Sequence, residues 1–272
     1  MSILDWLIPW EPSPLFMLLT VLAAGLYGLG ARRRKPGLPR QLAFWCGLIL
    51  TYLAMQSRLD FYAEHAFVVH RAQHLVLHHL GPFLIVLAYP GVQWRSGLPL
   101  SWRVALRRLG RWPPIHGLLR VLLHPFVAVL LFVGLIYFWL WPSIQFMVMI
   151  DARWYELMNW SMVLDGLLFW WLLLDSRPKP PAWMAPGVRI LTAAAAALPQ
   201  ILIGAYITFT TKDLYPIYDL CGRVIPGMSA ATDQYLGGLI IWIPGAMMTV
   251  LAGLLAFRHW VRLSSRGRLE KR

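Results

Sequence analysis

The chain has 272 residues, of which 58% are hydrophobic and only 14% are charged. Because an ordinary soluble domain is about 25% charged, this composition excludes that class and is typical of a membrane protein. The formal net charge of +13 does not indicate nucleic-acid binding, because the basic residues cluster at the ends of apolar stretches and not along one amphipathic face.

Seven apolar stretches follow in chain order, at about 14–31, 41–56, 66–88, 121–141, 154–175, 187–208 and 234–257. A membrane-spanning helix needs about 20 mostly apolar residues, so this length has room for these spans and for no separate soluble domain. We therefore predict an all-α, polytopic transmembrane bundle of seven spans, forming a single domain over 1–272. The first stretch is expected to be retained, because it lacks the basic start of a secretory signal peptide.

Basic residues predict the orientation of the bundle. Lys and Arg number five in 32–40, six in 95–120, three in 177–189 and six in 258–272, against five elsewhere. The positive-inside rule assigns the dense connections to the cytoplasm, which puts the N-terminus outside and the C-terminus in the cytoplasm. Most acidic residues, from Asp5 to Asp233, then lie at the outer side, either because acids carry no topological penalty there or because they attract cations.

The third span is unusually polar, since it contains His70, His74 and His78 at intervals of four residues. On a helix these histidines lie along one stripe, and ionisable groups in hydrocarbon are expected to face the bundle interior. Neutral imidazole binds Cu, Zn, Fe and Ni, so the stripe is a candidate metal site. The alternative is a structural role, in which the histidines form hydrogen bonds between helices.

Two acidic residues of the fifth span are expected at the same membrane depths as histidines of the third span. Counting the helical rise from the outer end of each span places Glu156 in the outer part of the fifth span, at the depth of His70 and His74 in the third. The same count places Asp165 level with His78. A lone carboxylate at the membrane midplane would be costly, so Asp165 is expected to pair with His78 or His79. Such a pair is compatible with either a structural or a functional role.

Methionines also gather towards the predicted outer side. The set comprises Met147, Met149, Met158, Met162 and Met228. Thioethers favour Cu(I), so together with the imidazoles they favour copper over zinc, although methionine is also a common packing residue.

The longest predicted outer connection, 209–233, mixes aromatic and acidic residues. Asp233 lies at the start of the seventh span, where a carboxylate can cap that helix. Tyr215, Tyr218 and Tyr235 are expected to be interfacial aromatics. Cys221 and Cys46 are expected at different depths, which disfavours a disulfide. The full set of candidate metal ligands is His70, His74, His78, Glu156, Asp165 and Asp233.

No nucleotide-binding glycine loop, serine nucleophile elbow or HExxH motif occurs in the sequence. These motifs mark the common hydrolases and phosphotransferases. We therefore expect a protein that is not an enzyme.

Several segments resemble the seven-helix CtaG family of cytochrome c oxidase assembly factors. They are HAFVVHRAQHLVLHHLGPFLIVLAYP, LDGLLFWWLLLDSRPKPP, LYPIYDLCGR and SAATDQYLGGLIIWIPGAMM. The most specific features are the His-x-x-x-His segment before a Pro-containing apolar run and the pattern Asp-Gln-x-x-x-Gly-x-x-x-Trp-x-Pro-Gly. The resemblance covers most of the chain from about 45 to 257.

The resemblance implies a chaperone of the cytoplasmic (inner) membrane that helps to assemble cytochrome c oxidase by supplying copper to its metal centres. Its partners would be oxidase subunits or other assembly factors within the lipid bilayer, and not nucleic acid. By motif match, the positions that carry over are His70, His74 and the pair Asp233 and Gln234.

The chain departs from the family pattern early in the fifth span. Family members often have histidines there, whereas this chain has Tyr155, Glu156 and Asn159, which are harder ligands. Two alternatives are a copper transport protein and a haem-binding electron-transfer subunit. A transporter needs polar groups that continue inwards, but the third span is apolar below His79 apart from a proline and a tyrosine. Bis-histidine haem ligation needs histidines on two facing helices.

Overall fold

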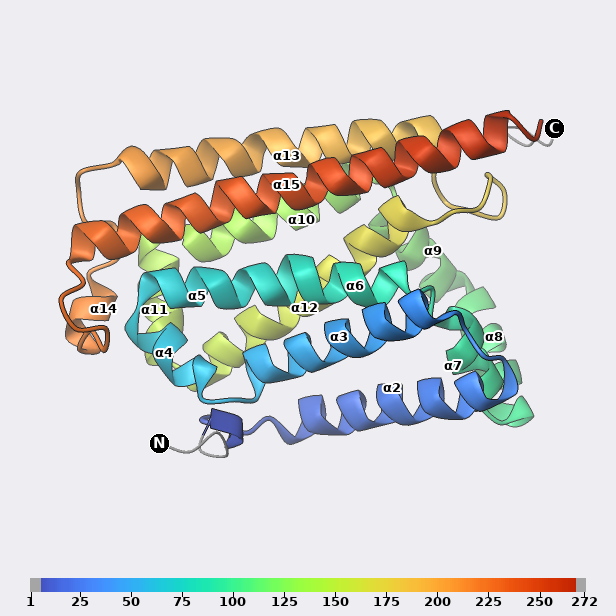
Figure 1. Cartoon of the computed structure of the whole chain (residues 1–272), viewed down its shortest axis with the longest axis horizontal. Helices are drawn as coiled ribbons and strands as arrows, with labels where there is room; N and C mark the ends of the chain where they lie inside the picture. Colours follow the sequence, from blue (N-terminus) through green and yellow to red (C-terminus); the bar gives the residue numbers. More distant parts are fainter. Residues whose placement is uncertain (1–5, 268–272) are drawn as a thin grey trace.

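A computed structural model describes residues 6–267, and this part of the chain contains helices and no strand (Figure 1). Asp5 and the last five residues lie outside the described residues. In chain order the helices are α2 (Pro14–Arg33), α3 (Leu38–Met55), α4 (Leu59–His65), α5 (Phe67–His74), η1 (Leu75–Leu80), α6 (Gly81–Leu87), α7 (Gly91–Gly97), α8 (Leu100–Arg111), α9 (Pro113–Leu122), α10 (Pro125–Leu140), α11 (Pro142–Ile150), α12 (Ala152–Leu174), α13 (Pro186–Phe209), α14 (Ile217–Leu220) and α15 (Ala230–Ser264).

Four of these helices, α2, α12, α13 and α15, are each long and apolar enough to cross a membrane. Three bent pairs pass the same test if each pair counts as one span: α3 with α4, the continuous helix 67–87 with α7, and α9 with α10. The bends are 53°, 71° and 68° respectively. The described part of the chain is therefore all-helical, with four helices able to span a membrane, or up to seven spans if each bent pair is one. Each predicted apolar stretch coincides with one of these helices or pairs.

The long helices run between two ends of the bundle (Figure 1). The short helices α4, α11 and α14 lie at one end, which we call the acidic end because Glu11, Asp60, Glu64, Glu156 and Asp233 belong to it. The helices α7, α8 and α9 lie at the other, basic end, with Arg33, Arg95, Arg103, Arg107 and Arg177. The separation of charge expected from the sequence is thus present in the fold.

Several helices begin at a proline. Pro14, Pro125, Pro142 and Pro186 each occupy the first position of a helix, where the missing N–H removes no hydrogen bond and the fixed φ suits the helix. The helix α12 has a side-chain cap instead, since the Asp151 carboxylate accepts the N–H groups of residues 153 and 154.

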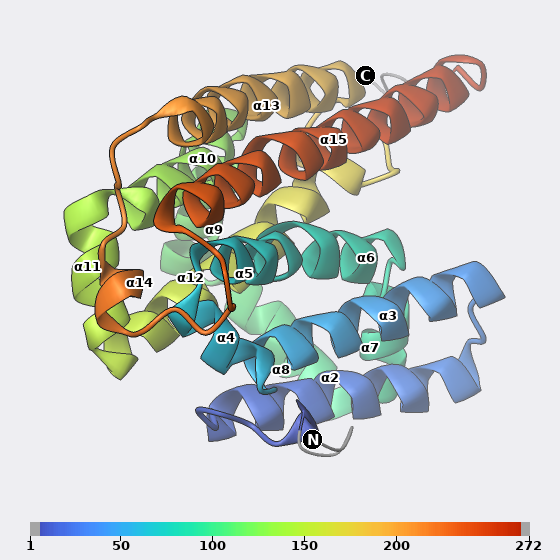
Figure 2. The ribbon, with the colours of Figure 1, turned by 60° about the vertical axis from the view of Figure 1, so that its left-hand side comes forward.

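The pair α13 and α15 runs side by side along the bundle (Figures 1 and 2). Glycines permit this approach, because a Cβ at Gly204 would collide with Trp242 and a Cβ at Gly238 would collide with the Thr208 backbone. An apolar core lies beside this pair. It includes Phe132, whose ring stacks on that of Phe169 at a centroid distance of 3.8 Å.

The basic connection between the third and fourth predicted spans is helical, which the sequence analysis did not anticipate. The helix α7 folds back against α2, where Gly30 and Gly97 leave room for the facing backbone at Gln93 and Leu26. By contrast, α8 and α9 bury no residue. The arginine-rich α8 is too polar for a hydropathy search, and α9 begins eight residues before the predicted stretch 121–141, so neither helix was predicted.

The connection 209–233 packs inwards at the acidic end. Tyr215 and Tyr218 are 3% and 0% exposed, so their interpretation as interfacial aromatics is wrong. The Tyr215 ring stacks on Phe67 at 4.2 Å, and its hydroxyl donates to the Leu140 carbonyl over 3.0 Å. These contacts join segments that are distant in sequence, which composition alone does not reveal.

Both cysteines, Cys46 and Cys221, are free, as expected from their different depths.

Candidate metal centre

The histidine-bearing helix lies inside the bundle, between α3, α12 and α15 (Figure 2). It runs from Phe67 to Leu87 and contains the π-helical segment η1, a feature that is frequent at functional sites. His70, His74, His78 and His79 are each no more than 5% exposed. The prediction that the histidine stripe faces the interior is therefore confirmed.

The first two histidines stack on each other within α5. Their ring centroids are 4.5 Å apart, with 24° between the ring planes. Neither nitrogen of His70 nor of His74 has a hydrogen-bond partner among the described residues. A buried polar atom without a partner is costly, so four such atoms side by side make this turn a candidate ligand site.

A small cavity adjoins the imidazoles of His74, His78 and His79, whereas His70 does not line it. It has a volume of about 30 Å³, and its lining includes Arg71, His74, His78, His79 and Met162. That space is enough for a single ion or a water molecule. Imidazole and thioether are both copper ligands, so the donor set fits copper.

The two lower histidines have partners on other helices. His78 Nε2 lies 3.0 Å from Asp165 Oδ2, so the predicted midplane pair is confirmed and His78 is the partner. A Cβ at Gly166 would collide with the His78 carbonyl, which shows how closely α12 approaches this turn. His79 Nε2 lies 2.8 Å from Gln200 Oε1 on α13. Both pairs anchor the helix, and their roles as metal ligands stay predictions.

Arg71 is a feature of the site that sequence reasoning passed over. It is 4% exposed, its guanidinium lies 5.2 Å from the Phe67 ring centroid, and its Nε and Nη2 atoms have no partner among the described residues. This residue follows His70 directly and lines the same cavity as His74. A buried guanidinium repels a metal cation, so it weakens any metal binding at the two imidazoles.

Asp233 occupies a different place from the one expected. Its carboxylate does not cap its own helix, because the Ser229 hydroxyl caps it by accepting the N–H of Thr232. Instead its two oxygens accept the N–H groups of Phe67 and Val68 over 2.9 and 2.7 Å, which caps α5. Arg223 forms an ion pair with the same carboxylate. The aspartate therefore positions the histidine-bearing helix.

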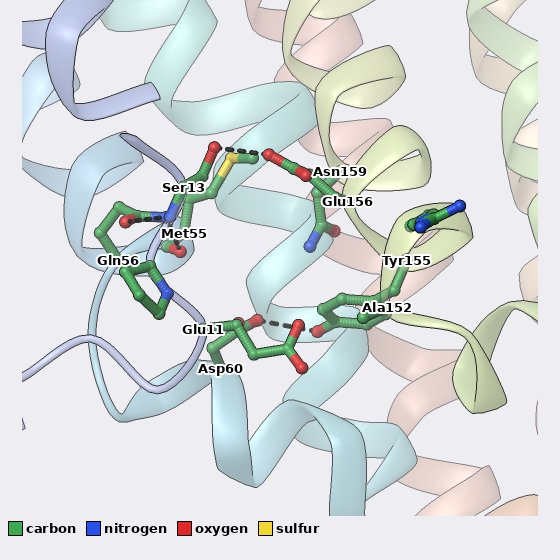
Figure 3. Close-up of a pocket in the computed structure, with 11 residues that line it drawn as sticks. Glu11, Ser13, Met55, Gln56, Asp60, Ala152, Tyr155, Glu156 and Asn159 are labelled. Atoms are coloured by element: carbon green, nitrogen blue, oxygen red, sulfur yellow. Dashed lines mark hydrogen bonds between the residues drawn. The ribbon is translucent and has the colours of Figure 1, made fainter. Parts of the chain in front are cut away.

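Glu156 lies apart from the imidazoles, in a pocket at the acidic end (Figure 3). Its Oε1 accepts hydrogen bonds from the Ser13 hydroxyl over 2.5 Å and from the Trp160 indole over 3.3 Å. The structure thus brings His70, His74 and His78 together along one helix, joins Asp165 to that set, and places the other two acidic candidates elsewhere.

A buried network separates the pocket from the imidazoles. Asp60 Oδ1 accepts hydrogen bonds from the Tyr155 hydroxyl over 2.8 Å and from Gln73 Nε2 over 2.6 Å. The Tyr155 ring lies 5.9 Å from the His70 ring, centroid to centroid. The sequence analysis did not connect these residues with one another: Tyr155 was noted only as a departure from the family pattern, and the signal for Gln73 was its place in the polar third span.

The methionines divide into two groups. Met158 and Met162 of α12 are 0% and 3% exposed, and Met162 lines the histidine cavity. Met147 is 65% exposed, so its side chain does not belong to a buried site. Of the methionines in the predicted set, Met162 is the one that lines the histidine cavity among the described residues.

Comparison with known proteins gives a family match and distant relatives. The model of the family described as cytochrome c oxidase caa3 assembly factor (Caa3_CtaG) matches residues 22–263. Uncharacterised proteins of Mycobacterium bovis and Mycobacterium tuberculosis are each 25% identical over 252 residues, and one of Mycobacterium leprae is 23% identical over 261 residues.

These alignments cover 90% of this chain and 37% or 38% of each relative, so the chain spans less than two fifths of their length. No solved structure matches the chain. The family match covers most of the sequence and confirms the resemblance found in the histidine and Asp-Gln segments. The chain belongs to the family of cytochrome c oxidase caa3 assembly factors.

Proposed function

We propose that this protein acts in the cytoplasmic membrane as a non-catalytic assembly factor that receives copper at His70 and His74 and passes it to cytochrome c oxidase. The observation that carries the proposal is the set of four buried imidazole nitrogens without a partner among the described residues. Copper is the cargo here, since imidazole and the neighbouring Met162 thioether suit it. Partners are oxidase subunits or other assembly factors.

The buried charge of Arg71 supports delivery over storage. A permanent guanidinium next to His70 disfavours a bound cation by electrostatic repulsion, and the repulsion is strong where water is excluded. A delivery protein must release its cargo to a partner, so weak binding suits this role. Removal of the Arg71 charge would then tighten copper binding and slow its transfer.

A transport function has less support. Beyond His79 the helix α6 buries Pro82, Phe83, Ile85 and Val86, and these residues provide no polar path towards the basic end.

Haem ligation has less support for a different reason. The four buried histidines all belong to the helix 67–87, whereas a bis-histidine haem needs a second helix.

The test is a double variant, His70→Leu with His74→Leu, expressed in place of the wild type. Leucine is well tolerated in hydrocarbon and removes the partnerless nitrogens, so the variant is expected to fold and accumulate. Oxidase activity should fall by about tenfold or more, on the scale of losses at metal sites. Copper bound by the purified protein should fall in parallel, and added copper should partly rescue activity.

A matched control is His116→Leu, because that histidine is exposed on α9 and lies outside the site. It should leave both oxidase activity and bound copper unchanged. Normal oxidase activity at normal abundance of the double variant would refute copper delivery by these histidines. A loss of abundance would support a structural role for the stripe instead.

A further inference from the structure

A second pocket opens at the acidic end, distinct from the histidine cavity. Its volume is about 210 Å³, and it lies between the segment before α2, the start of α4 and the first turns of α12 (Figure 3). Four of the residues that line it are Glu11, Asp60, Glu156 and Asn159. The proposed copper function makes no use of this pocket.

Three carboxylates converge beside the pocket. Glu11, Asp60 and Glu64 each offer one oxygen, and these oxygens lie within 4.8 Å of one another. Hydrogen bonds use Oδ1 of Asp60 and Oε2 of Glu64, which leaves the other oxygen of each carboxylate for a ligand. Oxygens on opposite sides of a calcium ion are about 5 Å apart, since each Ca²⁺–O distance is about 2.3–2.6 Å, so the spacing matches such an ion.

A buried amide at the pocket provides independent support. Asn159 is 2% exposed, and its Oδ1 has no hydrogen-bond partner among the described residues. Figure 3 shows this side chain extending from α12 into the pocket. An amide oxygen is a typical ligand of a hard divalent cation, and a bound cation would satisfy this otherwise costly atom, directly or through a water molecule.

The charge balance of the pocket favours a cation. Glu156 adds a fourth carboxylate, while Arg153 is the one basic residue that lines the pocket. The carboxylates therefore repel one another, and a divalent cation between them would relieve the repulsion.

We propose that Glu11, Asp60, Glu64 and Asn159 form a binding site for a hard divalent cation of the Ca²⁺ class. The three carboxylates and the amide offer only oxygen, which suits Ca²⁺ and Mn²⁺ and does not suit Cu(I). The cation joins the segment before α2 to the helix α4, so it fixes the N-terminal segment onto the bundle. The proposal is independent of copper delivery by the histidines.

The experiment uses the purified full chain in detergent, with Mn²⁺ as a paramagnetic probe and Ca²⁺ as its competitor. Binding is measured by loss of the free Mn²⁺ signal in electron paramagnetic resonance. We expect a dissociation constant of about 10⁻⁴–10⁻³ M, as in partly exposed oxygen sites, and displacement by Ca²⁺. Ca²⁺ should also raise the unfolding temperature of the wild type, because it binds the folded state.

The variant Glu11→Gln with Glu64→Gln keeps the size of both side chains and is expected to weaken Mn²⁺ binding by about tenfold or more, since affinity follows the ligand charge. The matched control is Asp219→Asn, an acidic residue of the same end whose side chain is 54% exposed, and it should bind as the wild type does. His70→Leu with His74→Leu should also leave Mn²⁺ binding intact, so the two sites fail separately. Unchanged binding in the glutamine variant, or absence of binding in the wild type, would overturn the proposal.

Discussion

Single buried residues at this site find their partners far away in the sequence. His78 and Asp165 were predictable as a pair, because the rise of each helix fixes the depth of a residue in the bilayer. Depth does not determine which helices are neighbours. The capping of α5 by Asp233, 166 residues from Phe67, therefore escaped prediction, as did the burial of Arg71.

The midplane pair predicts a stability effect at the residue scale. In the variant Asp165→Leu, both His78 nitrogens lack a partner, because Nδ1 already has none among the described residues. The expected loss is about 1–3 kcal/mol, measured as lower abundance and a lower unfolding temperature. Asp165→Asn keeps a hydrogen-bonding atom and should lose less. Adding His78→Leu to Asp165→Leu should restore part of the loss, and strict additivity of the two single changes would show that the contact does not matter.

At the scale of elements, the length of an apolar stretch predicted the bounds of several long helices accurately, whereas polar helices were not predicted from hydropathy. The predicted stretches 14–31, 154–175 and 187–208 lie within two residues of α2, α12 and α13 at each end. The helix α15 continues to Ser264, seven residues beyond the apolar stretch, because a helix does not have to end where hydropathy does. The amphipathic helix α8 gave no apolar signal. The helix α9 and the π-helical turn overlap predicted apolar stretches, but hydropathy reveals neither the bend after α9 nor the π-helical geometry.

The packing of α13 against α15 predicts which glycines tolerate a side chain. In Gly238→Leu the new side chain would collide with the Thr208 backbone and push the helices apart, which costs about 1–3 kcal/mol or more. Gly253→Ala is the matched control in the same helix, because its Cβ would meet the Ala193 Cβ at an ordinary 3.6 Å. The first variant should lower abundance and the unfolding temperature, whereas the second should be neutral or slightly stabilising. Equal behaviour of the two variants would contradict this account of the helix crossing.

On the scale of the whole molecule, two observations together favour seven spans. The sequence places its basic clusters in alternate connections, and the fold collects them at one end while most of the carboxylates lie at the other. If only the four straight helices crossed the membrane, the three bent pairs would lie outside the hydrocarbon. The buried helix 67–87, which belongs to one of these pairs, would then lie outside it as well. Counting each bent pair as one span keeps every basic cluster on one side.

Reporter fusions test this arrangement directly. If the chain has seven spans with the basic end in the cytoplasm, fusions after Lys35, Arg177 and Ser265 should be active as cytoplasmic reporters. Fusions after Asp151 and Lys212 should be active only as exported reporters, because these residues belong to the acidic end. A cytoplasmic signal at Lys212 would exclude the seven-span arrangement. It would also place the pocket lined by Glu11, Asp60 and Glu156 on the wrong side for receiving cations from outside the cytoplasm.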